Sequence, residues 1–228
     1  MRDLCLTCRR ARSVCWCPQV VPFELGFDLA LLMHPRETRV SIGTGRMVHR
    51  SVLGSRIWVG DRFDDEDRLW QSFERRTPVV LFPGPDAIDL DHPDAVSKIE
   101  HLDLRDKRLA VVAVDGTWTT ARGMLRKSPR LEALPKLALR PTVKARYDQI
   151  RKEPRLECHS TLESIHALID RLDAVGLANA PAGRPHDAML NLLDNVIDEQ
   201  LRFVPVAHRE NAARSRATRG TRDSSPIP

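Results

Sequence analysis

The sequence predicts an α/β fold, a mostly parallel sheet with flanking helices, and two observations support it. Short apolar runs rich in β-branched residues span 56–59, 79–82 and 109–114, and each is followed by Gly, Pro or Asp. Such runs are typical of strands that are buried on both faces of a parallel sheet. Segments with helical periodicity alternate with these runs, as they do when helices cover a sheet on both sides. We therefore expect one α/β domain.

The first part of this domain is predicted to run from a strand into a helix. Residues 26–33 (GFDLALLM) form an apolar run and predict the strand, and residues 34–40 predict a polar loop after it. A helix is expected over about 45–53. The carboxyl end of the first strand then leads directly into this helix through a loop that contains Gly43, Thr44 and Gly45.

Two later helices have clearer patterns than the strands. Apolar residues fall on one helical face between 162 and 175, and the pattern recurs over 189–197 behind Pro185. Ser160 and Glu163 have the spacing of a capping box at the start of the first of these helices, and Gly176 follows its end. The two patterns predict two long amphipathic helices near the end of the domain.

Four of the five cysteines gather at the start of the chain. Cys5 and Cys8 have the C-x2-C spacing that metal sites favour, and Cys15 and Cys17 follow with a tighter spacing, whereas Cys158 stands alone. In a reducing compartment, four close thiols are better suited to one tetrahedral Zn²⁺ than to disulfides. The cluster predicts a small zinc-binding segment whose ion orders the N-terminus and takes no part in chemistry.

Composition suggests three parts and a polyanionic partner. We assign residues 1–22 to the zinc-binding segment, 23–206 to the catalytic domain and 207–228 to a disordered basic tail. The net charge is +5, which permits local basic patches. No window approaches the roughly 18 consecutive apolar residues of a membrane helix, and the polar start does not resemble a signal peptide. We expect a cytoplasmic protein without a membrane partner, and the oligomeric state is left open.

The most informative segment is 109–127, LAVVAVDGTWTTARGMLRK. The apolar run ends at Asp115, and Thr117 is placed to cap a helix. Ligands of α/β proteins bind at the carboxyl ends of strands, so Asp115 is placed where chemistry usually occurs. The alternative is that both residues only end a strand and start a helix. The predicted helix carries three basic residues that suit phosphate contacts: Arg122, Arg126 and Lys127.

Three further segments carry weaker signals. Thr44 and Gly45 precede a helix and can present backbone N–H groups to an anion, although an ordinary turn explains them as well. The run Leu81, Phe82, Pro83 and Gly84 follows a strand and by itself indicates only a loop. The segment 146–163 offers basic and aromatic side chains for RNA, namely Arg146, Tyr147, Arg151 and Lys152, or it is a solvated basic loop.

The combination of these segments is specific. HPRE, TGR, LFPG, DGTW, RKEP and STLE occur in this order behind the cysteine cluster, and together they closely resemble the DTW-domain family over about residues 5–175. The resemblance implies a SPOUT-related fold in which a topological knot holds S-adenosylmethionine in a bent shape. It also implies transfer of the 3-amino-3-carboxypropyl group of that molecule to N3 of a uridine in tRNA.

The resemblance also implies roles for matching positions. Asp115 becomes the base that takes the N3 proton, or an anchor for the ribose hydroxyls or amino group of S-adenosylmethionine. His159 departs from the family pattern, which has leucine before STLE, and this changes one wall of the expected pocket. The positions expected to contact S-adenosylmethionine are Thr44, Gly45, Leu81, Phe82, Pro83, Gly84, Thr117, Trp118, Ser160, Thr161 and Leu162.

Two rival functions remain open at the level of sequence. A SPOUT-like RNA methyltransferase would use the same fold and donor, because the sulfonium has three electrophilic carbons and geometry decides which one reacts. A zinc-bearing RNA-binding module without catalysis would need only the cysteines and the basic segments. Methylthioadenosine as by-product identifies propyl transfer, and absent binding of S-adenosylmethionine identifies the module.

Overall fold

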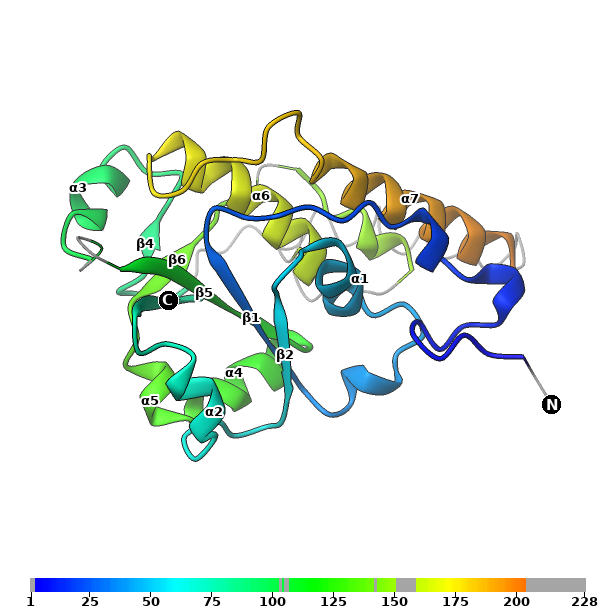
Figure 1. Ribbon diagram of the computed structural model, residues 1–228, viewed down its shortest axis with the longest axis horizontal. Coiled ribbons are helices and arrows are strands. Elements are labelled where there is room, and N and C mark those ends of the chain that lie inside the picture. The colour runs from blue at the N-terminus through cyan, green and yellow to red at the C-terminus, as the bar shows by residue number, and fades with distance from the viewer. Residues whose placement is uncertain (1–2, 103, 105–106, 142, 151–158, 204–228) are drawn as a thin grey trace, which may run out of the picture.

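The computed structural model describes residues 3–102, 104, 107–141, 143–150 and 159–203. A sheet of six strands lies between two helical layers (Figure 1), and every strand pairing in it is parallel. Its order is β2-β1-β5-β3-β6-β4. The strands are β1 (Asp28–Met33), β2 (Arg56–Val59), β3 (Arg76–Leu81), β4 (Ile88–Asp89), β5 (Arg108–Asp115) and β6 (Lys136–Ala138). The predicted fold class is confirmed, while the knot and the SPOUT relationship stay predictions.

Helices cover both faces of the sheet because the strands alternate between two cores. In β5, Leu109, Val111 and Ala113 pack into one core, and Ala110 and Val112 pack into the other. The first core also takes in α1 (Thr44–Ser51), α6 (Thr161–Ala174) and α7 (Asp187–Arg202). The second takes in α2 (Asp67–Gln71), α4 (Trp118–Arg126) and α5 (Pro129–Glu132). The short helix α3 (Ala95–Ile99) lies at the β4 edge (Figure 1).

Local sequence signals explain where several elements begin and end. The capping box at α6 is present, since Ser160 Oγ accepts from the Glu163 N–H and the Glu163 carboxylate accepts from the Ser160 N–H. Thr117 Oγ1 accepts from the Thr120 N–H and caps α4. Gly176 follows α6 with φ of 72°, a conformation that glycine adopts without strain. These predicted caps are confirmed.

Some boundaries and elements differ from the predictions. The first strand begins at Asp28, and its following helix spans Thr44–Ser51 and is therefore shorter than expected. Elements β4, β6, α2, α3 and α5 were not predicted, because each has at most five residues and too few positions to show a period. Some of the predictions concern residues outside the described ones, namely Arg151, Lys152, Cys158 and the tail at 207–228. None of the described helices is long and apolar enough to cross a bilayer.

Candidate functional site

The central strand β5 ends at the carboxyl edge of the sheet with Asp115 in the predicted place. Strands β1 and β3 flank β5, and parallel pairing brings the residues that follow all three strands to this edge. The His34 N–H donates to the Asp115 carbonyl oxygen at 2.9 Å, so the loop after β1 begins beside the end of β5. In open α/β sheets this edge is where ligands bind. The sequence-based placement of Asp115 is confirmed.

The side chain of Asp115 is enclosed between the first turns of two helices. It is 5% exposed, and its Oδ1 accepts a hydrogen bond from Thr161 Oγ1, in the first turn of α6, at 2.6 Å. A Cβ atom added at Gly45, in the first turn of α1, would lie 2.3 Å from Asp115 Oδ2. Any side chain at residue 45 would therefore displace the carboxylate. Helix N-termini carry partial positive charge, which suits an anion in this position.

The loop between β1 and α1 is built around the guanidinium of Arg46. Its Nη1 donates to the carbonyl oxygens of Glu37 at 3.3 Å and Thr38 at 2.9 Å, and its Nη2 donates to that of Val40. Burial lowers the pKa of Arg46, and the nearby charge of Arg9 lowers it further, while Asp115 opposes the shift. The side chain that follows Gly45 thus fixes the loop that borders the Asp115 site.

An aromatic pair joins the ends of β3 and β5. Phe82 and Trp118 stack with ring centroids 4.9 Å apart and an interplanar angle of 12°. The Arg122 guanidinium lies 5.5 Å from the Trp118 ring centroid on the next turn of α4. Both rings are half-buried, whereas Pro83 and Gly84 are exposed. The structure therefore brings the LFPG and DGTW segments together through this stacked pair, as the family resemblance implied.

Not every predicted ligand contact is available at this edge. Leu162 is completely buried in the core, so its side chain does not form a wall of the site. The Ser160 hydroxyl is engaged with Glu163 at 2.7 Å within the capping box. Thr44, which begins α1, is 6% exposed. Of the STLE segment, Thr161 is the residue whose side chain reaches Asp115.

Of the side chains predicted to contact RNA, some are buried or paired within the protein and others are exposed. The Tyr147 ring is 4% exposed and its hydroxyl donates to the Ile42 carbonyl oxygen at 2.6 Å, so the prediction that this ring stacks on a base is wrong. It fills the core beneath the loop after β1. Arg146 pairs with Asp194 of α7, and Lys127 pairs with Asp61 at 2.6 Å. The exposed side chains of Arg122 and Arg126 stay candidates for RNA contact.

The four N-terminal cysteines converge as a metal site requires. Cys5 and Cys17 sulfurs are 3.9 Å apart, those of Cys8 and Cys15 are 3.6 Å apart, and all four lie within 4.8 Å of one another. Four sulfurs at 2.3 Å from one ion would lie about 3.8 Å apart in a tetrahedron. Backbone N–H groups, first that of Cys8, lower the pKa of Cys5 to about 6, whereas burial raises the pKa of Cys17. The donor set fits Zn²⁺.

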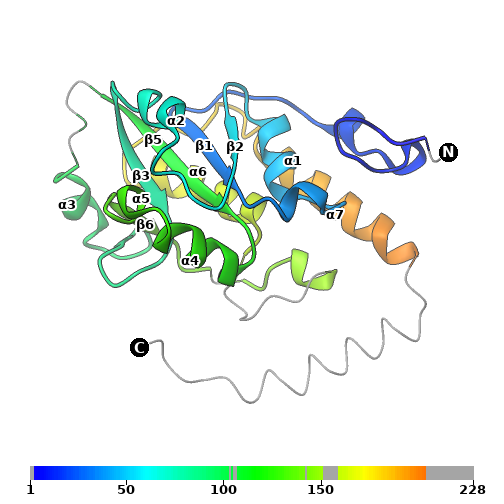
Figure 2. The same ribbon diagram turned by 90° about the horizontal axis from the view of Figure 1, so that it is seen from below.

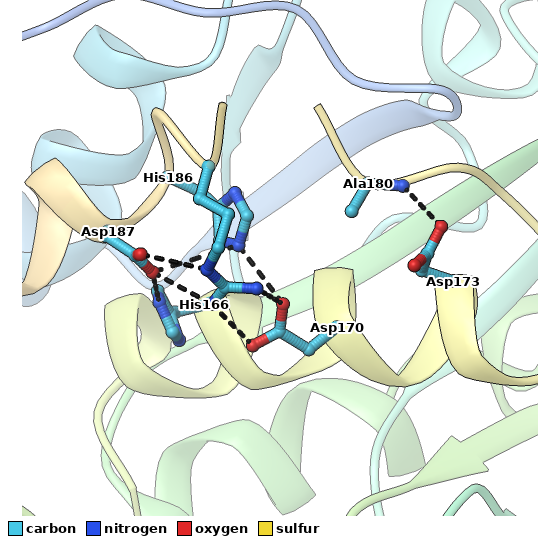
Figure 3. A network of polar contacts seen from close by, with 7 residues as sticks. His166, Asp170, Asp173, Ala180, His186 and Asp187 are labelled. Atoms are coloured by element: carbon cyan, nitrogen blue, oxygen red, sulfur yellow. Dashed lines mark hydrogen bonds and ion pairs between the residues drawn. The ribbon is translucent and has the colours of Figure 1, made fainter. Parts of the chain in front are cut away.

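A second cluster of potential metal ligands joins α6 to the segment before α7 (Figure 3). His166 Nε2 lies 2.8 Å from Asp187, and the fully buried His186 lies 3.1 Å from Asp170. Arg184 pairs with both carboxylates and holds the pKa of Asp187 at about 2. Because a guanidinium already neutralises these carboxylates, we interpret the cluster as a clamp between helices, which we call the α6–α7 clamp.

Of a pair of cavities beside the sheet and its loops, the larger lies away from Asp115. It has a volume of about 280 Å³ and is lined at the amino ends of β1 and β5 by residues that include Phe27, Asp28 and Arg108. A second cavity of about 220 Å³ lies between Val40, Ile42 and Tyr147, beneath the loop after β1. We place the functional site at the carboxyl edge all the same, because the strand-end motifs and the enclosed carboxylate meet there.

Sequence reasoning missed several residues that shape this site. Gly45 and Asp115 are 70 residues apart in the chain, and no local sequence pattern predicts that they lie close together. The bonds of Arg46 to backbone carbonyls are equally invisible in sequence, although Arg46 belongs to the TGR motif. The α6–α7 clamp had one signal, the presence of histidines and aspartates on one helical face and at the next helix start.

The chain is an α/β protein with an enclosed carboxylate at the carboxyl edge of its sheet, and comparison with known proteins gives the family. The model of the DTW domain family matches residues 2–201, and the chain belongs to this family. It is 28% identical over 170 residues to the tRNA-uridine aminocarboxypropyltransferase 2 of Drosophila melanogaster, covering 72% of this chain and 64% of that protein.

Two mammalian proteins of the same name are also similar. Those of Mus musculus and Macaca fascicularis are 25% and 24% identical over 194 residues, which is 82% of this chain and 62% of each relative. The chain thus spans less than two thirds of the length of these relatives. No solved structure matches it.

Proposed function

We propose that this protein is a tRNA-uridine aminocarboxypropyltransferase. It transfers the 3-amino-3-carboxypropyl group of S-adenosylmethionine to N3 of a uridine in tRNA and releases methylthioadenosine. Membership in the DTW family and the names of the relatives support this function. The observation that carries it is the position of Asp115, which ends the central strand between the first turns of α1 and α6.

In the proposed reaction, one bond forms and one bond breaks at the same carbon atom. N3 of the uridine attacks the propyl carbon bonded to sulfur, the new N–C bond forms, and the C–S pair of electrons stays on sulfur. The sulfonium loses its charge and leaves as the thioether of methylthioadenosine. The N3 proton passes to the Asp115 carboxylate, which acts as general base. A carboxylate is a weak base for an imide, so N3 loses its proton as the N–C bond forms and the C–S bond breaks.

Other residues of the chain orient Asp115 and contact the donor in this proposal. The Thr161 hydroxyl and the absence of a side chain at Gly45 orient Asp115 at the strand end. We infer that S-adenosylmethionine lies against Thr44, Gly45, Leu81–Gly84, Thr117 and Trp118, with the half-buried Phe82–Trp118 pair as the apolar surface. The propyl carbon reacts in place of the methyl carbon when it is held in line, within about 3–3.5 Å of N3.

For the cysteine cluster we propose one structural Zn²⁺ held by Cys5, Cys8, Cys15 and Cys17. The sulfur separations support it. The ion orders the N-terminal segment and has no open position for chemistry when four thiolates hold it. Arg9, directly after Cys8, donates to the Thr38 carbonyl oxygen at 2.9 Å and links this segment to the loop beside Asp115. The reduced thiols that such a site needs agree with a cytoplasmic protein.

Product analysis tests the activity. The protein is incubated with S-adenosylmethionine and unmodified tRNA, the tRNA is digested to nucleosides, and nucleosides and small molecules are measured by mass spectrometry. We expect aminocarboxypropyl-uridine and methylthioadenosine in equal amounts. S-adenosylhomocysteine and a methylated nucleoside would identify a methyltransferase instead. Tight tRNA binding with neither product, and no heat of binding with S-adenosylmethionine, would identify a binding module.

A further inference from the structure

Three exposed arginines lie close together on one side of the Asp115 site. Arg9 belongs to the cysteine segment, and Arg36 and Arg39 belong to the loop between β1 and α1. All three are exposed, and none forms an ion pair within the part of the chain that the structure describes. Figures 1 and 2 both show the blue N-terminal segment beside the loop after β1. We call these three residues the arginine patch.

Hydrogen bonds hold the patch at a fixed place relative to Asp115. Arg9 Nη1 and Arg46 Nη1 both donate to the Thr38 carbonyl oxygen, each at 2.9 Å, and Thr38 lies between Arg36 and Arg39 in the chain. One end of this loop is bonded to Asp115 through the His34 N–H. Its other end reaches Gly45, which touches the Asp115 carboxylate. The patch therefore cannot move far without disturbing the site.

Several other exposed cations are already neutralised by carboxylates, whereas the three arginines of the patch are not, as far as the described residues go. On the face that carries α4 and α5, Lys127 pairs with Asp61, and Arg62 pairs with Asp65. Near the cysteines, the exposed Arg12 pairs with Asp3, and the buried Arg10 pairs with Glu199. A paired cation contributes little to the attraction of a distant anion, whereas unpaired arginines attract phosphates and can bind them through two N–H groups.

We propose that Arg9, Arg36 and Arg39 bind the phosphate backbone of the RNA substrate next to the reacting uridine. This inference rests on the proposed function for the identity of the RNA. It assigns the cysteine segment a second task, since Arg9 brings that segment into the RNA surface. It also favours these three arginines as phosphate contacts over Lys127 and Arg146, whose charges are paired.

Salt-dependent binding of tRNA tests the patch. The triple variant R9Q/R36Q/R39Q and the unaltered protein are titrated with unmodified tRNA at several salt concentrations, and affinity is read by fluorescence anisotropy. Each phosphate contact contributes about 0.7–0.9 to the slope of log affinity against log salt. We expect the triple variant to lose at least about tenfold in affinity and about two units of slope.

Arg75→Gln is the matched control. Arg75 is also exposed, but it precedes β3 and lies at the amino edge of the sheet. We expect its slope to match that of the unaltered protein. Zinc content and the affinity for S-adenosylmethionine, measured by calorimetry, should be unchanged in the triple variant, which shows that the segment and the site remain folded.

The outcomes separate this inference from the proposed function. Unchanged tRNA affinity in the triple variant, or an equal loss in Arg75→Gln, overturns the patch even if the protein still modifies tRNA. A triple variant that binds tRNA poorly supports the patch even if the unaltered protein makes no aminocarboxypropyl product, and the proposed function then fails alone. Binding to anionic lipid vesicles with no affinity for tRNA also overturns the patch.

Discussion

The two edges of the same sheet use their charged residues differently. At the amino edge, Asp28 of β1 pairs with Arg76 of β3 and, at 3.1 Å, with Arg108 of β5, so that one carboxylate ties the starts of three strands together. At the carboxyl edge, Asp115 accepts from the hydroxyl of Thr161 and faces the bare Cα of Gly45. The first arrangement holds strands, and the second holds a carboxylate in a defined place.

This difference shows why cavity size alone does not locate the site. The larger cavity is lined by Asp28 and Arg108, which already satisfy each other at the amino edge. The carboxyl edge collects a positioned carboxylate, an aromatic pair and the first turns of two helices. Sites combine a few placed polar groups with apolar surface, and the carboxyl edge has both.

The largest expected effect follows from removing the charge at the carboxyl edge. Asp115→Asn keeps the shape of the side chain but cannot accept the N3 proton, so we expect product formation to fall about 1,000-fold. The initial rate of methylthioadenosine release with tRNA measures it. Asp28→Asn is the matched control, and we expect activity within about twofold and a melting temperature a few degrees lower. Near-normal activity in Asp115→Asn would remove this residue from the chemistry.

The next largest effect is expected when one methyl group is added at residue 45. Gly45→Ala places a Cβ atom 2.3 Å from Asp115 Oδ2, which is too close. The carboxylate must therefore shift by about 1 Å, and such a displacement costs about 100-fold in rate. In Gly123→Ala, the added Cβ atom meets nothing within 4 Å on helix α4. We expect Gly123→Ala to keep full activity and to melt at the same or a higher temperature. Equal rates in the two variants would contradict the close approach.

A smaller effect is expected from the cysteine segment, which lies beside the site but outside the chemistry. Cys8→Ser removes a fully buried sulfur, and we expect zinc content, measured by mass spectrometry, to fall from about one equivalent to near zero. Melting temperature falls with it. Cys158→Ser changes the cysteine outside the cluster and should retain the metal. Substoichiometric zinc in the unaltered protein, purified without chelator, would contradict the four-thiolate site.

The smallest effect concerns the α6–α7 clamp and its dependence on pH. Arg184 lowers the pKa of Asp187 to about 2, below its value in the unfolded chain, so the stabilisation is present above about pH 4 and is lost as pH falls toward 2. We expect Arg184→Ala to melt lower at pH 6 and to show a shallower decline of melting temperature between pH 4 and 2.5. Parallel curves for both proteins would contradict this role.

The sequence predicted the fold class and the position of Asp115, and the reasons are local. Buried parallel strands have continuous apolar runs, and an aspartate directly after such a run must lie at the carboxyl edge. The caps of α4 and α6 follow from Ser, Thr and Glu at fixed spacings. These features depend on neighbours within four residues, so they can be predicted from the local sequence without knowledge of the tertiary structure.

The contacts that complete the site depend on tertiary structure. Thr161 meets Asp115 across 46 positions of sequence, and Tyr147 turns inward to Ile42 across 105. A lone tyrosine in a basic segment suggests an exposed ring, but the core beneath the loop after β1 takes it instead. Which arginines remain unpaired is also decided by folding, because Lys127 finds Asp61 only when α4 packs on the sheet.

The most direct test of the proposed site is to locate the bound S-adenosylmethionine. Hydrogen exchange of the protein is measured with and without saturating S-adenosylmethionine, peptide by peptide. We expect slower exchange at the carboxyl edge, in segments 43–46, 81–84, 116–118 and 160–162. Protection confined to 24–29, 53–54 and 108, which line the larger cavity, would contradict the placement of the donor at the carboxyl edge.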